Sequence, residues 1–162
     1  MAKRGNSKKV IRAPGFLCEA IQYNSAFSRG VRVDSRAMTM LFISGTASID
    51  SQGKSLHRGD FLAQSQRVFD NISALLDSEN ISWKDVVQTR CYLKSMRYYK
   101  KFNEIRTKFY QKQGLIFFPA SVCVEARLCR PELLIEIEAL AISGIKRKNG
   151  SLKKALNFRK NP

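Results

Sequence analysis

The sequence has little of what most metal-binding and hydrolytic sites are built from. Its 162 residues contain one histidine, His57, which argues against a histidine-based metal site and against a Ser-His-Asp triad. Neither GxGxxG nor GxxxxGK[ST] occurs, so the chain lacks the common phosphate-binding loops. The cysteines show no CxxC spacing, and we expect free thiols at all four positions, Cys18, Cys91, Cys123 and Cys129.

Long hydrophobic runs are also missing. No segment is long enough to span a bilayer, and the basic start is not followed by the apolar stretch of a signal peptide. We therefore expect a cytoplasmic protein without membrane contact. A chain of this length suits one domain and can bury roughly 70% of its unfolded surface.

Acidic residues are absent from both ends, and most of the formal charge of +16 is concentrated there. Residues 13–143 hold 17 of the 29 basic residues and all 13 acidic ones, so this body carries only +4. We expect a basic disordered arm over 1–14, a domain over 15–143 and a basic flexible tail over 144–162. Such ends raise solubility and can contact RNA non-specifically, because they carry charge without interleaved aromatic residues.

Hydrophobic periodicity predicts five strands and two helices. In chain order they are strands over 31–33 and 39–44, a helix over 61–76, a strand over 85–94, a helix over 98–109, and strands over 120–128 and 133–142. We expect the first helix to begin at Asp60 and the second to end near Gly114. The last two strands are expected to form a hairpin through Cys129–Glu132. This order is typical of an α+β domain in which two helices pack on one face of a single mixed sheet.

The stretch LLIEIEALA, residues 133–141, raises the question of what the second face of the sheet contacts. One parity of this strand is apolar, whereas the other reads Leu134, Glu136, Glu138, Leu140. The hairpin would set Glu125 opposite Glu136, because a slip of one residue would bring charged residues against the core. Further members expected on this face are Cys123, Ser121, Arg127, Arg90, Tyr92 and Phe42.

This mixture of carboxylates and apolar side chains has two interpretations. It is either a subunit interface that leaves water-filled pockets, or a partly solvated open sheet with cross-strand ion pairs. The residue pattern alone does not decide between them.

Several segments resemble the Rid (YjgF, L-PSP endoribonuclease-like) family over about residues 27–142. The resemblance is carried by FSRGVRV (27–33), LFISGTASID (41–50), FPASVCVEARL (118–128) and LLIEIEALA (133–141). It implies a chorismate-mutase-like α+β subunit that closes into a homotrimer, with a ligand cleft between each pair of neighbours.

The family resemblance also implies a chemistry. Well-known members hydrolyse imines and enamines, such as 2-iminobutanoate, to 2-oxo acids and ammonia without a cofactor. An arginine binds the substrate carboxylate, and a glutamate places and activates a water. The glutamate falls on Glu136, the cleft asparagine on Asn103 and the cleft cysteine on Cys123, which forms a pocket wall. The family's arginine position is Ser121 here.

The serine at position 121 puts ordinary imine hydrolysis in question. A bidentate arginine makes two charge-assisted bonds of about 1.5 to 3 kcal/mol each, which one hydroxyl cannot replace. Arg127 lies six residues along the strand, roughly 20 Å away, and is too distant to substitute. Arg90 is the better candidate, although it could instead pair with Glu125 or Glu136. Glu136 could likewise be half of an interface ion pair.

Three alternatives to imine hydrolysis stay open. The segments GTASI and CRPELLIEIE resemble the C-terminal half of chorismatases, which implies a relative acting on chorismate or an aromatic acid. The family's reported ribonucleases and the basic ends favour an RNA-associated protein. A non-catalytic trimer that binds a small carboxylate metabolite or a partner protein is the third.

Overall fold

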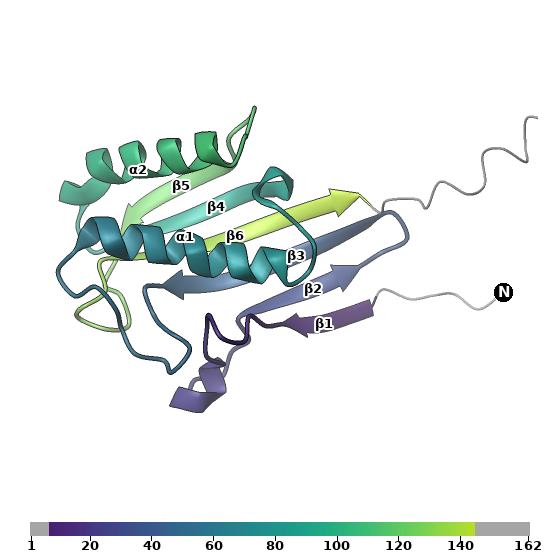
Figure 1. The fold of residues 1–162 in the computed structure, drawn as a ribbon, viewed down its shortest axis with the longest axis horizontal. Helices are drawn as coiled ribbons and strands as arrows, with labels where there is room; N and C mark the ends of the chain where they lie inside the picture. Colours follow the sequence, from purple (N-terminus) through teal and green to yellow (C-terminus); the bar gives the residue numbers. More distant parts are fainter. Residues whose placement is uncertain (1–6, 145–162) are drawn as a thin grey trace, which may run out of the picture.

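The alternating segments of the sequence form six strands, and the segments of helical period form two helices (Figure 1). The structure is a computed structural model that describes residues 7–144. The strands are β1 (Ser7–Ile11), β2 (Gly30–Asp34), β3 (Met38–Ala47), β4 (Val86–Leu93), β5 (Ala120–Glu125) and β6 (Ile135–Gly144), and the helices are α1 (Phe61–Asp77) and α2 (Tyr99–Lys112). The strand order is β1-β2-β3-β6-β4-β5, in which β4 and β5 are parallel and the other pairs antiparallel.

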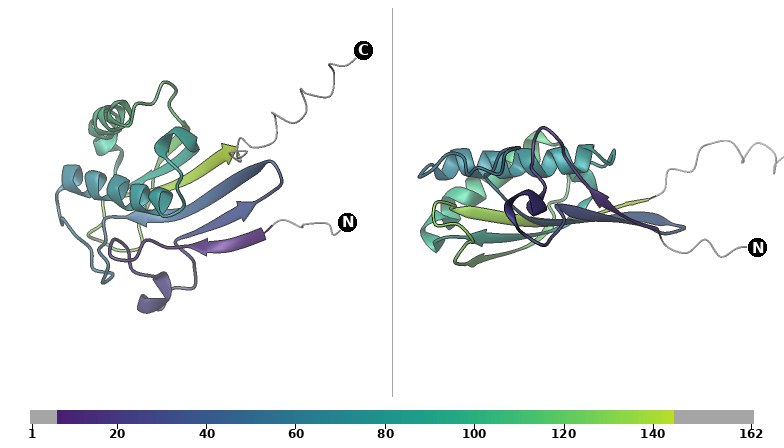
Figure 2. Two further views of the ribbon diagram at one scale, coloured as in Figure 1. Left: turned by 45° about the vertical axis from the view of Figure 1, so that its right-hand side comes forward. Right: turned by 90° about the horizontal axis from the view of Figure 1, so that it is seen from below.

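Both helices lie on one face of this mixed sheet, which confirms the predicted fold class (Figure 2). α1 begins as expected, because the Asp60 side chain accepts a hydrogen bond from the Ala63 amide at 3.0 Å. The core between the layers is aromatic: the Phe69 and Phe109 rings stack 4.3 Å apart, and Trp83 meets Phe109 edge-on at 5.0 Å. α2 ends two residues before Gly114, which has a positive φ of 68°.

The predicted hairpin between the last two strands is wrong. β5 instead pairs in parallel with β4, joined to it through α2, and β6 inserts between β3 and β4. Hydrogen bonds from backbone amides hold the segment between β5 and β6, which the sequence pattern predicted to be a tight turn. The Ala126 amide donates to the Leu93 carbonyl at 2.9 Å, and the Leu134 amide donates to the Gln64 side chain at 2.8 Å.

This pairing reverses the predicted parity of β5. Cys91 pairs with Cys123 and Tyr92 with Val124, and partners in register share a face of the sheet. Cys123 therefore packs toward the helices, whereas Val122 and Val124 are 48% and 41% exposed on the uncovered face. The pairing of β5 was predicted wrongly because Val122 and Val124 were expected to line the core.

Two more residues predicted for the second face lie elsewhere. The Glu125 carboxylate accepts a hydrogen bond from the Met96 amide at 2.7 Å, so it caps a turn and does not sit opposite Glu136. Leu134 precedes β6 and is buried in the main core. Of the three predicted carboxylates, only Glu136 and Glu138 remain on the uncovered face.

The predicted basic arm is shorter than expected. Ser7–Ile11 form β1, which pairs with β2 at the edge of the sheet, and Ile11 is fully buried. Residues 1–6 and 145–162, which carry the remaining arm and tail predictions, lie outside the described residues. Within the described part, no helix is both long and apolar enough to cross a membrane.

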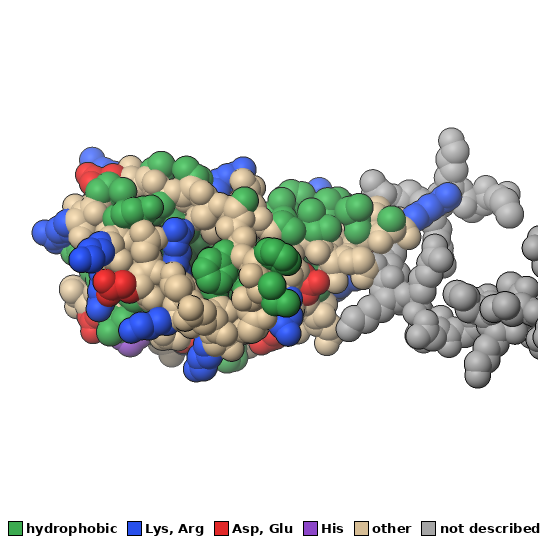
Figure 3. All heavy atoms as spheres, turned by 90° about the horizontal axis from the view of Figure 1, so that it is seen from above, with side chains coloured by type: hydrophobic (Ala, Val, Ile, Leu, Met, Phe, Trp, Pro, Cys, Tyr) green, Lys and Arg blue, Asp and Glu red, His purple; other side chains and the backbone are tan. Residues whose placement is uncertain are grey.

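Large apolar side chains are exposed on the uncovered face and on the edge formed by α2 and β5. Figure 3, which looks down on this edge, shows hydrophobic groups at the surface between charged ones. The most exposed belong to the loop between α2 and β5, where Ile116 and Phe117 are 88% and 86% exposed. This much apolar surface is typical of an interaction site.

Candidate active site

Glu136 lies near the start of β6 on the face that the helices leave open. Its backbone is in register with Ala47 of β3 on one side and Tyr92 of β4 on the other. β3 has an irregularity between Ile43 and Thr46, and Gly45 within it leaves room for the glutamate. A Cβ on Gly45 would overlap Oε1 of Glu136. The glycine of the SGTA stretch is therefore required by the close approach of this carboxylate.

The environment of Glu136 favours its protonated form. Burial raises the pKa of Glu136, the neighbouring Glu138 carboxylate raises it further, and Arg29 opposes both. The described residues make no hydrogen bond or ion pair to the Glu136 carboxylate. A half-buried carboxylate with a raised pKa and free oxygens is suited to accept a proton from a water molecule.

The carboxylate faces a pocket of about 550 Å³, a volume that fits a small metabolite. We call it the Glu136 pocket. Its polar and aromatic wall consists of Tyr23, Ser25, Phe27, Arg29, Ser44, Arg130 and Glu136. These side chains come from three segments: the loop before β2, the irregular part of β3, and the β5–β6 region. The pocket therefore exists only because β6 lies beside β3.

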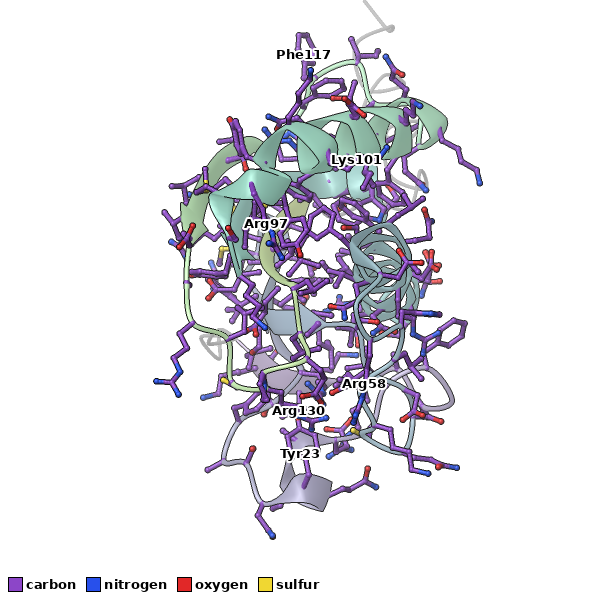
Figure 4. All side chains as sticks on the ribbon, turned by 90° about the vertical axis from the view of Figure 1, so that its left-hand side faces the viewer. Tyr23, Arg58, Arg97, Lys101, Phe117 and Arg130 are labelled. Carbon is purple, nitrogen blue, oxygen red and sulfur yellow. The ribbon has the colours of Figure 1, made fainter. Side chains whose placement is uncertain are left out.

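Two arginines packed against a tyrosine ring form the basic side of the Glu136 pocket. The guanidinium carbon of Arg29 lies 5.3 Å from the Tyr23 ring centroid, and that of Arg130 lies 5.2 Å from it. Figure 4 shows Arg130 beside Tyr23, with Phe117 at the opposite end of the molecule. Arg130 also donates to the Gly53 carbonyl at 2.7 Å and to Ser55 at 3.1 Å. Burial raises the pKa of Tyr23.

Sequence reasoning missed Tyr23, Arg29 and Arg130 as site residues. Arg130 was interpreted as part of a turn, and Arg29 only as part of a family segment. No spacing in the sequence marks them, because they meet Glu136 only through tertiary contacts. The one available signal was that residues 13–143 hold 17 basic residues against 13 acidic ones.

Arg90 and Tyr92 lie on the same face as Glu136 but do not line its pocket, and Arg90 lines a neighbouring hollow of about 400 Å³ with Glu138. Arg90 Nη1 lies 3.2 Å from Glu138 Oε2, and the Tyr92 hydroxyl donates to Glu138 Oε1 at 3.0 Å. Arg90 therefore forms its ion pair with Glu138, and not with Glu125 or Glu136 as the sequence suggested. A substrate-binding role for Arg90 or Tyr92 stays a prediction.

Ser121 and Cys123 lie on β5, at the far edge of the sheet from the Glu136 pocket. Arg106 of α2 donates from Nη1 to the Ser121 hydroxyl at 3.1 Å, and Thr89 donates to the same oxygen at 3.2 Å. Burial raises the pKa of the Cys123 thiol to about 11, and the nearby Cys91 adds to the shift. A neutral thiol fits the predicted role of a wall and not that of a nucleophile.

Asn103 lies on α2 and is partly buried. Its Oδ1 is shielded from solvent and has no hydrogen-bond partner among the described residues. An unpaired buried amide oxygen normally costs about 1 to 3 kcal/mol, so it calls for a donor that the described residues do not supply, such as a water or a neighbouring molecule. One subunit thus does not bring Asn103, Ser121 or Cys123 into the Glu136 pocket.

Metal ions need a set of ligating side chains that lie close together. Among the described residues, no group of three or more His, Cys, Asp or Glu side chains lies close enough together to hold a metal ion. The Glu136 pocket itself brings together one carboxylate, two guanidinium groups and the hydroxyls of Tyr23, Ser25 and Ser44.

Comparisons with known proteins show the family and agree with the fold. The family model described as Endoribonuclease L-PSP matches residues 18–143. A RutC family protein of Pyrococcus horikoshii is 35% identical over 106 residues, which cover 65% of this chain and 81% of that protein. The 3-aminoacrylate deaminase RutC of Acinetobacter baylyi is 28% identical with the same coverage. The crystal structure of the YjgF gene product of E. coli superposes with a TM-score of 0.67 at 26% identity, covering 83% of this chain and 98% of that one.

Proposed function

The chain belongs to the endoribonuclease L-PSP (Rid) family, and we propose that it is a deaminase that hydrolyses small imine or enamine acids at Glu136. The support is the environment of one carboxylate: Glu136 is half-buried, has a raised pKa and faces an open pocket without a protein partner. The similarity to a 3-aminoacrylate deaminase supports this class of reaction.

The proposed reaction adds one water across the C=N bond. Glu136 accepts a proton from the water as its oxygen attacks the imine carbon, which gives a tetrahedral carbinolamine. Glu136 returns this proton to the nitrogen, and the hydroxyl proton of the carbinolamine then passes through Glu136 to the same nitrogen. The C–N bond breaks, and ammonia leaves with both protons of the water while the C=O bond of the 2-oxo acid forms. An enamine first takes a proton on carbon to become the imine. No group other than water is consumed.

We propose further that three copies of the chain assemble and complete the site. The uncovered sheet face carries Phe42, Val122 and Val124 as exposed apolar groups, which a neighbouring subunit would cover. The β5 edge, with Ser121 and Cys123, lies far from the Glu136 pocket in one subunit. A neighbour that packs its β5 edge against this pocket would bring the two halves together and give the Asn103 amide a donor.

The test generates 2-iminobutanoate in situ with a threonine dehydratase and follows 2-oxobutanoate against the spontaneous rate. We expect acceleration by the wild-type protein and a loss of at least about 100-fold in Glu136→Gln. Glu104→Gln removes a solvent-exposed carboxylate on α2 and should keep the wild-type rate. Both variants should sediment as trimers. A wild-type rate in Glu136→Gln, or a monomeric wild-type protein, would contradict the proposal.

A second candidate ligand is an aromatic carboxylate, because the Tyr23 and Phe27 rings form part of the pocket wall. Thermal-shift measurements with chorismate and benzoate test it. A ligand at a hundred times its Kd stabilises the protein by about 2.7 kcal/mol. Stabilisation by these acids but not by 2-oxobutanoate would favour the aromatic class over the imine acid.

A further inference from the structure

The Glu136 pocket contains a guanidinium group that the family pattern does not assign. We propose that Arg29 binds the substrate carboxylate in place of the arginine that Ser121 replaces. This inference rests on the proposed function for the identity of the substrate, but the binding it describes can be measured without turnover.

Arg29 is a buried charge without an acidic partner. Only 2% of the residue is exposed, and no carboxylate of the described residues lies within 4.0 Å of its nitrogens. Arginines are almost never fully buried unless they are paired, because the charge loses its hydration. An anion in the pocket would supply the missing partner.

Contacts with the N-terminal loop hold the Arg29 side chain in place. Nε donates to the Cys18 carbonyl at 2.7 Å, and Nη2 donates to the Cys18 sulfur at 3.4 Å. The guanidinium carbon lies 5.3 Å from the ring centroids of both Tyr23 and Phe27. The backbone carbonyl of Arg29 accepts a hydrogen bond from the Ser44 amide at 3.1 Å, which fixes the Arg29 backbone against β3. The two side-chain bonds use two of the five N–H groups, and a further interaction with the Tyr23 side chain still leaves donors available to a ligand.

Arg29 and Glu136 line the same pocket but do not form an ion pair. They are nevertheless close enough for Arg29 to affect the ionisation of Glu136. A substrate carboxylate bound to Arg29 would therefore place the adjacent imine carbon on the Glu136 side of the pocket. This is the order of groups that the reaction needs: guanidinium, carboxylate, imine carbon, water, glutamate.

The other arginines near the proposed cleft are already engaged. Arg90 pairs with Glu138 in the neighbouring hollow, and Arg106 donates to Ser121 at the β5 edge. Arg130 lines the Glu136 pocket, but it donates to a backbone carbonyl and a serine and is less buried than Arg29. Arg130 adds positive potential, whereas Arg29 has the burial and the free donors of a binding group.

The experiment uses the stable product 2-oxobutanoate as the probe and measures its Kd by isothermal calorimetry. We expect Arg29→Gln to weaken binding by at least about tenfold, because bonds to a charged group are lost. Arg29→Lys keeps the charge but not the paired geometry, so it should bind with intermediate affinity. Glu136→Gln should lose turnover without weakening 2-oxobutanoate binding, because it removes a negative charge from the pocket that holds this anion.

Arg67→Gln is the matched control for damage to the loop. Arg67 donates to the backbone carbonyls of Phe16 at 2.9 Å and Ile49 at 3.3 Å, so it holds the same N-terminal region from outside the pocket. We expect its affinity for 2-oxobutanoate to equal that of the wild type. Thermal unfolding of each variant checks that it is folded. If Arg29→Gln does not fold, the comparison is made with Arg29→Lys instead.

Three results would overturn the assignment. They are wild-type affinity in both Arg29 variants, an equal loss in Arg67→Gln, or a loss in Arg106→Gln that exceeds the loss in Arg29→Gln. Arg29-dependent binding without accelerated hydrolysis would support the assignment and contradict the proposed reaction. Hydrolysis with an unchanged KM in Arg29→Gln would support the reaction and overturn the assignment.

Discussion

The Glu136 pocket and the β5 edge differ in whether their polar side chains have hydrogen-bond or ion-pair partners. In the pocket, the Glu136 carboxylate has no hydrogen-bond or ion-pair partner among residues 7–144, and the Arg29 guanidinium has no acidic partner among them. At the β5 edge, the Ser121 hydroxyl accepts from both Thr89 and Arg106, and the Cys123 thiol is held neutral. Groups left unpaired at a structural cost are the better candidates for binding and chemistry. The difference places the reactive half of the proposed site around β6.

The largest effect is expected from Gly45→Ala. The added Cβ would overlap Oε1 of Glu136, and the flexible end of the glutamate can move away. We therefore expect hydrolysis to fall by about 100-fold, because a small misplacement of a catalytic group has effects of this size, while the thermal midpoint changes little. Gly144→Ala is the control, since nothing lies within 4 Å of its added Cβ. Equal rates in the two variants would exclude this role of the Gly45 gap.

The pH dependence of hydrolysis should report the ionisation of Glu136 and the effect of the neighbouring charges on its pKa. The ionised carboxylate is the active form, so the rate should fall as the pH is lowered through its raised pKa. Glu138→Gln removes one of the two causes that raise this pKa, so the acidic limb should move to lower pH. The measurement is the rate of 2-oxobutanoate formation from pH 4 to 8. An unmoved limb would mean that another group controls it.

Ser121→Ala should affect ligand binding less than Arg29→Gln. In the proposed trimer, Ser121 offers a neighbouring pocket at most one neutral hydrogen bond, which is worth about 0.5 to 1.5 kcal/mol. We expect the Kd of 2-oxobutanoate to rise by no more than about tenfold. A larger rise than in Arg29→Gln would move the carboxylate site to the β5 edge.

The smallest effect on hydrolysis is expected from the chain ends. Removal of residues 1–6 and 145–162 should leave the rate unchanged, because the described lining of the Glu136 pocket extends from Tyr23 to Glu136. If the RNA-associated alternative holds, the same truncation should abolish a steeply salt-dependent RNA affinity, measured by filter binding. The cut must stop before Ser7, because Ser7–Ile11 belong to the sheet. RNA binding that survives truncation would assign it to the domain.

Local signals in the sequence predicted most of the elements but not how the last strands pair. Asp60 and Gly114 mark helix ends through short-range geometry, and both predictions are confirmed. The β5 error arose because Val122 and Val124 resemble a core face, although this parity faces away from the helices. Pairing depends on partners far along the chain, so a short turn such as Arg130-Pro131 is weak evidence for a hairpin.

The candidate site could be predicted only in part for the same reason. Glu136 was identified from the alternation of its own strand together with the family resemblance. Arg29 and Arg130 were not, because their significance depends on three separate segments meeting at one pocket. The family pattern directed attention to Ser121, where the expected arginine is missing, and gave no indication of where another guanidinium lies.

The central position of β6 has a consequence for synthesis of the protein. Leu41 pairs with Ala141, so β3 waits for a partner about 100 residues further along the chain. Until the ribosome has released the last strand, β3 and β4 present unpaired inner edges that other chains can bind. Such distant pairing also slows folding. Glu136 thus arrives with the strand that closes the sheet, and a nascent chain ending before it should depend on chaperones to stay unaggregated.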